Sequence, residues 1–255
     1  MYWLESTVSL QKGMNMTVNE YNKKLEEFYF DYFKSNEIID SSNLNKLSVP
    51  MLLKVNENYF DPNKPTIFIF GQETNIWGEE NHNTYFHLRD NTDSTIKSVM
   101  GHYEWQLNRS KSKSTLITLN IDLKEKLSAK YNVLWSNLYK YSYEGKRITK
   151  NVSKEHFKNI MKHQKEFMKF ELELFQPEGM IFLTGKNLDT EIEHNLNAKV
   201  ERINNYGEFC SQLKITSDFD IKQDMKVFRT PHPDRYRWEK INKNDVIECI
   251  ADNFN

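Results

Sequence analysis

The stretch from Lys64 to Asn75 constrains the fold more than any other part of this 255-residue chain. An apolar run, Ile67-Phe68-Ile69-Phe70, stops at Gly71, and polar residues follow at once. Short apolar runs of this kind are typical of strands that are buried on both faces, as in a parallel sheet. Such strands carry the residues that follow them to the carboxyl edge of the sheet, where α/β proteins place their chemistry.

A second segment late in the chain has the same character. Val227-Phe228-Arg229 is predicted to be a strand, and it breaks into the polar turn Thr230-Pro231-His232-Pro233. Because the carboxyl ends of parallel strands meet at one edge, we expect His232 to face the carboxylate of Glu73 across one cleft.

Strand and helix patterns alternate over most of the sequence. Thr17-Val18-Asn19-Glu20 is a capping-box pattern and predicts a helix that ends near residues 35–36. Further strands are predicted at 65–70, 133–135, 179–183 and 227–229, and further helices at 121–130, from 152 to just before Pro177, at 187–196 and around 246–254. Residues 200–215 are ambiguous, with a hairpin around 205–207 as one interpretation. The alternation predicts a three-layer α/β/α fold around a mainly parallel sheet of four to five strands.

The chain shows no linker, so one domain is expected over residues 1–255. Residues 1–63 are interpreted as an N-terminal helical extension, and residues 64–255 as the α/β core with an insertion at 78–115. This insertion contains three histidines, His82, His87 and His102. Their spacing matches no common ligand pattern, so we expect no metal and interpret the insertion as a cover over the cleft.

Composition narrows the class of protein. The net charge of −1 gives no overall attraction to nucleic acid, so any phosphate contact must come from local clusters. The two cysteines, Cys210 and Cys249, cannot supply a four-cysteine cluster and do not suggest a secreted disulfide scaffold. No signal peptide and no apolar run of about 18 residues are seen, so a cytoplasmic protein without a membrane span is expected.

Four strand ends, in order along the chain, resemble the uracil-DNA glycosylase superfamily. Gly71-Gln72-Glu73-Thr74 is similar to that family's GQD-P or G-x-N-P motif, and Asn137-Leu138-Tyr139-Lys140 is similar to its N-x-x-K motif. The segment from Glu171 to Gly185 resembles an "E…L…P…I…LG" helix and strand, and Pro231-His232-Pro233-Asp234 resembles its HP-S loop. The resemblance covers about residues 65–240.

This resemblance implies a monofunctional DNA glycosylase that flips a base, hydrolyses its N-glycosidic bond and leaves an abasic site, without a metal or cofactor. Glu73 would stabilise the positive charge that develops on the sugar and orient a water. His232 would stabilise the departing base as an oxyanion donor. Asn137 would read the base edge, because an amide offers one donor and one acceptor group.

The resemblance also implies a wider set of contacts. Tyr236 would enter the base stack, and the flanking arginines would meet phosphates. The expected base-binding residues are Gly71, Gln72, Asn75, Tyr85, Phe86 and Asn137, and the expected DNA-binding residues are Arg235, Tyr236, Arg237 and Lys140.

Three positions depart from the family pattern. Glu73 replaces the usual Asp, which moves the carboxylate by about one bond. Thr74 stands where Pro is common, and Asn75 stands where a bulky Tyr excludes thymine in the uracil-specific branch. The expected target is therefore uracil or a larger modified base, for example in phage DNA, which would make the protein part of an antiviral defence.

Other interpretations remain open. The chain can be a catalytically inactive module that binds nucleic acid or protein on the same scaffold, or a small-molecule nucleosidase that does not need Arg235 and Arg237. Glu73 can instead cap the following helix, Asn137 can satisfy loop backbone groups, and His232 can be a rigid turn residue. DNA is the expected partner, and the protein is expected to be a monomer.

Overall fold

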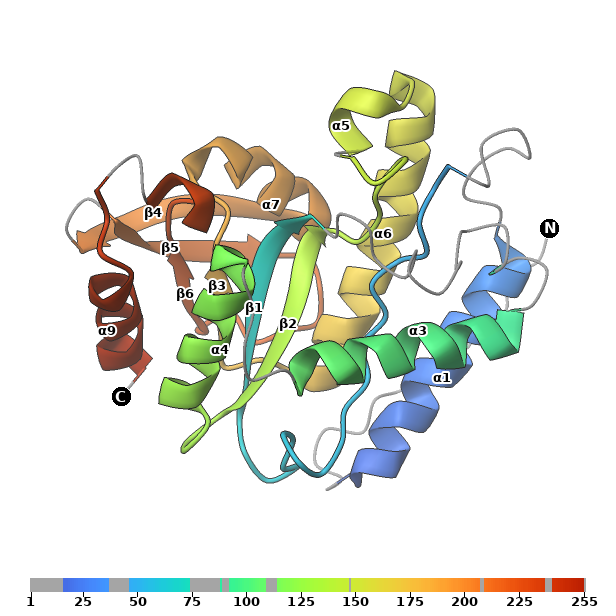
Figure 1. Cartoon of the computed structure of the whole chain (residues 1–255), viewed down its shortest axis with the longest axis horizontal. Coiled ribbons are helices and arrows are strands. Elements are labelled where there is room, and N and C mark those ends of the chain that lie inside the picture. The colour runs from blue at the N-terminus through green and yellow to red at the C-terminus, as the bar shows by residue number, and fades with distance from the viewer. Residues whose placement is uncertain are drawn as a thin grey trace.

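The computed structural model describes residues 16–36, 46–73, 88, 92–108, 114–146, 148–206, 209–236 and 240–254. Its centre is a six-stranded sheet with the strand order β2-β1-β3-β6-β5-β4 (Figure 1). The strands are β1 (Thr66–Glu73), β2 (Asn132–Tyr139), β3 (Gly179–Phe182), β4 (Ala198–Tyr206), β5 (Cys210–Ser217) and β6 (Lys226–Arg229).

The sheet is mostly parallel. β2, β1, β3 and β6 run in one direction, while β5 pairs antiparallel with β6, and β4 pairs antiparallel with β5. The predicted α/β class is confirmed, but the predicted number of strands was too low. The reason is that residues 198–217 form a hairpin whose two strands both extend the sheet, and β4 at its outer edge is largely exposed.

Helices cover both faces of this sheet (Figure 1). They are α1 (Val18–Ser35), α3 (Thr92–Leu107), α4 (Thr115–Leu127), α5 (Ile148–Asn151), α6 (Lys154–Phe175), α7 (Asp189–Leu196) and α9 (Lys243–Phe254), with 3-10 turns η3 (Lys186–Leu188) and η4 (Pro233–Arg235). Ile67 and Ile69 of β1 belong to the core cluster that includes α4 and α9, whereas Phe68 and Phe70 belong to the cluster that includes α1 and α6. This alternation explains why β1 is apolar at consecutive positions.

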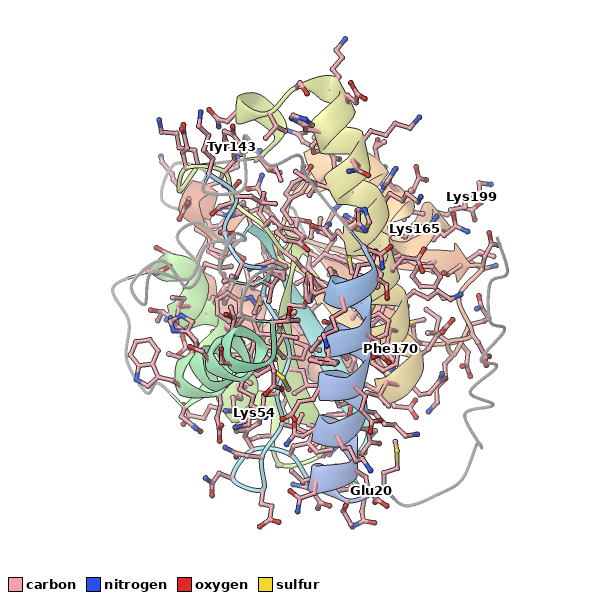
Figure 2. All side chains as sticks on the ribbon, turned by 90° about the vertical axis from the view of Figure 1, so that its right-hand side faces the viewer. Glu20, Lys54, Tyr143, Lys165, Phe170 and Lys199 are labelled. Atoms are coloured by element: carbon pink, nitrogen blue, oxygen red, sulfur yellow. The ribbon has the colours of Figure 1, made fainter. Side chains whose placement is uncertain are left out.

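The N-terminal helix α1 begins and ends where the sequence predicts. The Thr17 hydroxyl accepts a hydrogen bond from the Glu20 amide at 3.3 Å, and the Glu20 carboxylate accepts one from the Thr17 amide at 2.6 Å. The helix lies alongside α6, as Figure 2 shows, and the rings of Phe28 and Phe170 stack with their centroids 3.9 Å apart.

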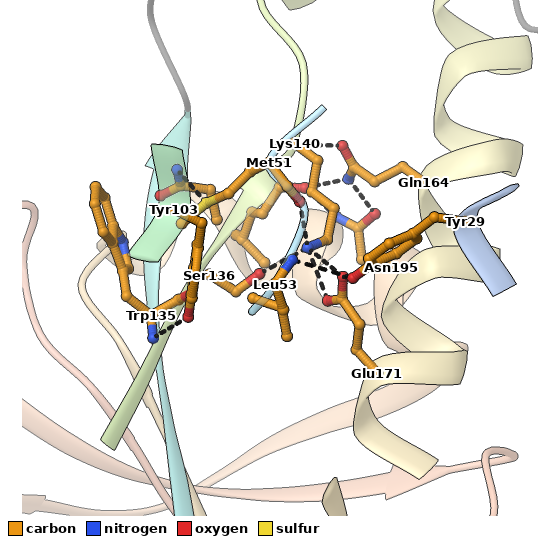
Figure 3. Close-up of polar contacts among 12 residues, drawn as sticks. Tyr29, Met51, Leu53, Tyr103, Trp135, Ser136, Lys140, Gln164, Glu171 and Asn195 are labelled. Atoms are coloured by element: carbon orange, nitrogen blue, oxygen red, sulfur yellow. Dashed lines mark hydrogen bonds and ion pairs between the residues drawn. The ribbon is translucent and has the colours of Figure 1, made fainter. Parts of the chain in front are cut away.

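An ion pair lies inside the core between these helices and the sheet (Figure 3). The Lys140 ammonium, which follows β2, lies 2.7 Å from Oε2 of Glu171 on α6, and both side chains are at most 2% exposed. The ammonium also donates to the Met51 carbonyl and the Ser136 hydroxyl, each at 3.1 Å. The Tyr29 hydroxyl of α1 donates to Glu171 at 2.8 Å, so the pair joins three elements of the fold.

Burial and pairing act in opposite directions on this ion pair. Burial lowers the pKa of Lys140 and raises the pKa of Glu171, while the attraction between the two groups opposes both shifts. Burial also raises the pKa of Tyr29 well above its ordinary value. Glu171 accepts hydrogen bonds from Lys140 and Tyr29, and Lys140 also donates to the Ser136 hydroxyl, so these bonds replace the water that the charged groups lose on folding.

A second buried polar group on α6 is His163, which is 7% exposed and hydrogen-bonds through Nδ1 to the Tyr32 hydroxyl of α1. Burial lowers the pKa of His163 from 6.5 to about 4, and the Lys162 ammonium adds to the effect. The imidazole is therefore neutral in the folded protein near neutral pH.

Stability should fall with acidification because of His163. The full contribution of His163 to the free energy of unfolding is present above pH 6.5. It is lost as the pH falls from 6.5 toward about 4, since only the unfolded chain takes up the proton in that interval. The loss is at most about 3 kcal/mol. Urea unfolding at several pH values should show a steeper decline in the wild type than in His163→Gln, which retains a hydrogen-bonding amide. Equal slopes in the two proteins would contradict the assignment.

None of the helices in the described part of the chain has both the length and the apolar character needed to cross a membrane.

Candidate functional site

The carboxyl edge of the parallel strands is held together by backbone hydrogen bonds. The Phe70 carbonyl of β1 accepts from the Leu183 amide at 2.8 Å, and the Phe182 carbonyl of β3 accepts from the Thr230 amide at 2.9 Å. The Gly185 amide donates back to the Thr230 carbonyl at 2.8 Å. The loops that leave β1, β3 and β6 therefore start from one connected edge.

Glu73 and His232 both stand at this edge. Glu73 is the last residue of β1 and is half-buried, and His232 follows β6 as the residue that caps η4. Only β3 separates β1 from β6, so their backbones are about two strand spacings, or 10 Å, apart. Two long side chains can approach one ligand across that distance.

His232 is held in a defined orientation. Its Nδ1 accepts a hydrogen bond from the Asp234 amide at 3.3 Å, and the side chain is 19% exposed. An imidazole that accepts through Nδ1 carries its proton on Nε2 when it is neutral, so Nε2 is the donor. Gly185 supports this turn with a φ of +76°, a conformation that favours glycine, and a Cβ there would lie 3.6 Å from the His232 amide.

Gly71 and Asn137 are paired across β1 and β2 in register. A Cβ at Gly71 would lie only 2.2 Å from Oδ1 of Asn137, so the glycine makes room for the amide. The Asn137 side chain is fully buried, and its Nδ2 donates to Met51 Sδ at 3.4 Å. Its Oδ1 accepts no hydrogen bond from the described residues. The amide is thus at the predicted edge but is covered rather than open to a ligand.

Gly71→Ala should be destabilising, because the new methyl group would collide with Asn137 in a fully packed region. We expect a loss of about 1–3 kcal/mol in the free energy of unfolding, as is usual for overpacking. Asn137→Ser in the same chain should recover much of that loss, because it removes the colliding oxygen. Denaturant unfolding of both single variants and the double variant measures the coupling. Strict additivity of the two changes would show that the predicted contact is absent.

Two residues that were expected to contact DNA, Lys140 and Tyr236, are buried in this structure. Lys140 has no exposed surface, because it turns inward to Glu171 instead of following the strand out of the sheet. Tyr236 is 4% exposed, and its hydroxyl donates to the Thr230 hydroxyl at 3.1 Å. It anchors the loop after His232 against the α9 side of the core, so it is not available as a wedge in this structure.

The other predicted site residues divide into two groups. Gln72 is 8% exposed at the end of β1, and Arg235 is exposed and lines a pocket. Asn75, Tyr85, Phe86 and Arg237 lie outside the described residues, as do His82 and His87 of the insertion.

Sequence reasoning overlooked Arg229, the last residue of β6. It is only 7% exposed, forms an ion pair with Asp189 of α7 and lines the same pocket as Arg235. The signal was present in the sequence, because an arginine that ends an apolar strand needs a partner for its charge.

Comparison with known proteins does not identify this site. No protein-family model matches the sequence, and no curated protein matches it. Within the described ranges, no group of three or more His, Cys, Asp or Glu side chains is arranged to hold a metal ion.

Proposed function

We propose that the protein is a DNA glycosylase that hydrolyses the N-glycosidic bond of an extruded base. The proposal is supported above all by the placement of Glu73 and His232 at one carboxyl edge, with a single strand between the strands that carry them. A carboxylate and an oriented imidazole donor are the two groups that this reaction requires.

In the proposed reaction, the C1′–N bond breaks and its electron pair leaves with the base. The Glu73 carboxylate stabilises the positive charge on the sugar and takes a proton from the water that adds to C1′. The Nε2–H of His232 donates a hydrogen bond to the oxygen on which the base accumulates negative charge. The target is uracil or a modified base such as one found in phage DNA, and an antiviral defence role, a monomeric state and a cytoplasmic location belong to the same proposal.

One observation favours a second function. Asn137 is fully buried, so the amide that was expected to read a base is not open to a ligand. A catalytically inactive module that binds nucleic acid or protein would not need such a group. This alternative predicts DNA or protein binding without chemistry.

The direct test is incubation of the protein with DNA that carries native, deaminated or hypermodified bases. Alkaline cleavage reports abasic sites, and mass analysis identifies the released base. We expect at least one substrate to give both signals. Binding without an abasic site on any substrate would favour the binding module, and cleavage of free nucleosides but not of DNA would favour a nucleosidase.

A further inference from the structure

A pocket of about 490 Å³ opens beside the carboxyl edge, on the side of the β4–β5 hairpin. It is bounded by the turn after β3, the end of β6 and the facing strands of the hairpin. Its lining residues include Lys186, Arg202, Phe209, Ser211, Arg229 and Arg235. The volume is in the range of pockets that hold small ligands.

Four cationic side chains line the pocket, and one of them, Arg229, is ion-paired with Asp189. Lys186, Arg202, Arg229 and Arg235 come from four separate elements, and none of the lining residues in the described part of the chain is acidic. The protein as a whole carries a net charge of −1, so this concentration of cations is local. Several cations around one cavity favour a ligand that carries negative charge.

The Arg229 guanidinium is held in a fixed position where it can contact such a ligand. Its Nη1 donates to the Asp189 carboxylate, and its Nη2 lies 3.5 Å from the Ser211 hydroxyl. These contacts hold a guanidinium that is only 7% exposed, and they use two of its five N–H donors. A planar guanidinium that is held in one orientation suits the oxygen atoms of a phosphate group.

The pocket is also lined by an aromatic residue and by uncharged polar residues, which binding of a simple anion would not require. Phe209 is a partly buried lining residue, and Asn205 and Ser211 also line the pocket, with the Ser211 hydroxyl donating to Asn205 Oδ1 at 3.0 Å. An aromatic ring beside a phosphate site is the combination that binds one unit of a nucleic-acid strand, since the base can stack on the ring.

We infer that this pocket binds the phosphate of a nucleotide unit, with the attached base against Phe209. The identification of that nucleotide unit as part of DNA rests on the proposed function. The binding of its phosphate by the pocket does not depend on that function. In a glycosylase, the pocket would hold the strand beside the catalytic edge, because Thr230 and Pro231 line it and lead directly to His232.

The experiment measures binding of a fluorescein-labelled single-stranded oligodeoxynucleotide by anisotropy, with inorganic phosphate and thymidine monophosphate as competitors. The test variant carries Lys186→Gln, Arg202→Gln and Arg235→Gln, which are all exposed positions. The matched control removes the same charge at the exposed positions Lys130, Lys158 and Lys169, which lie outside the pocket. We expect the test variant to lose about tenfold in affinity and about one unit of the slope of log affinity against log salt, with little change in the control.

Phe209→Ala distinguishes binding of the base from binding of the phosphate. It should weaken oligonucleotide and thymidine monophosphate binding about tenfold while leaving competition by inorganic phosphate unchanged. Equal binding by the test and control variants, or competition by neither phosphate compound, would overturn the pocket assignment. Base release by the otherwise wild-type protein is measured beside binding. Absence of base release together with pocket-dependent binding removes only the enzymatic proposal. Base release together with unaltered binding by the test variant removes only the pocket.

Discussion

Glu73→Gln is expected to lower the rate of base release by at least about 100-fold, while DNA binding is retained. A positioned carboxylate that takes a proton in the transition state contributes about this much or more to a rate. The amide of Gln is nearly the same size but cannot accept the proton from water or balance the charge on the sugar. Single-turnover release of the base measured beside equilibrium DNA binding gives both quantities.

Glu57→Gln provides a matched control, because Glu57 is exposed and lies in a turn ahead of β1, away from the carboxyl edge. Base release by this variant should equal that of the wild type. Unchanged release in Glu73→Gln would remove this residue from the reaction, and loss of DNA binding together with release would indicate a positioning role instead.

Lys140→Met is expected to destabilise the fold by about 3–5 kcal/mol, the usual cost of removing one partner from a buried ion pair. The remaining Glu171 carboxylate would be left in the core with the Tyr29 hydroxyl as a neutral donor. Guanidinium unfolding should therefore show a large decrease in the midpoint concentration without a change in the m-value.

The double variant Lys140→Met and Glu171→Leu should be more stable than Lys140→Met alone, because it leaves no unpaired charge. The exposed pair Lys23–Glu27 on α1 serves as a control, and Lys23→Met should leave the midpoint nearly unchanged. A double variant as unstable as the single one would show that packing, and not the unpaired charge, dominates the loss.

Much of the architecture was predictable from local patterns. The capping box at Thr17 fixes the start of α1, and the apolar runs around Ile67 and Ile181 mark strands that are buried on both faces. By contrast, α3 was not predicted. Its buried positions Ile96, Val99, Met100, Tyr103 and Leu107 follow helical spacing, but polar residues between them obscured the pattern.

The site was less predictable, because side-chain direction depends on distant partners. The edge positions of Glu73 and His232 follow from where strands end. The inward turn of Lys140 depends on Glu171, which lies 31 positions away. The cover over Asn137 depends on Met51, whose amide pairs with the Lys140 carbonyl at 2.9 Å. No motif spacing encodes such contacts.

The outer strand β4 has a consequence for how the protein behaves when it is concentrated. An uncovered strand edge can template the addition of a strand from another molecule, which begins aggregation. β4 presents the exposed charges of Lys199, Glu201 and Arg202 there, and its pairing with β5 shifts register between Arg202 and Asn204. Charge and local irregularity both oppose intermolecular strand addition, so the hairpin that widens the sheet also keeps neighbouring molecules from joining it.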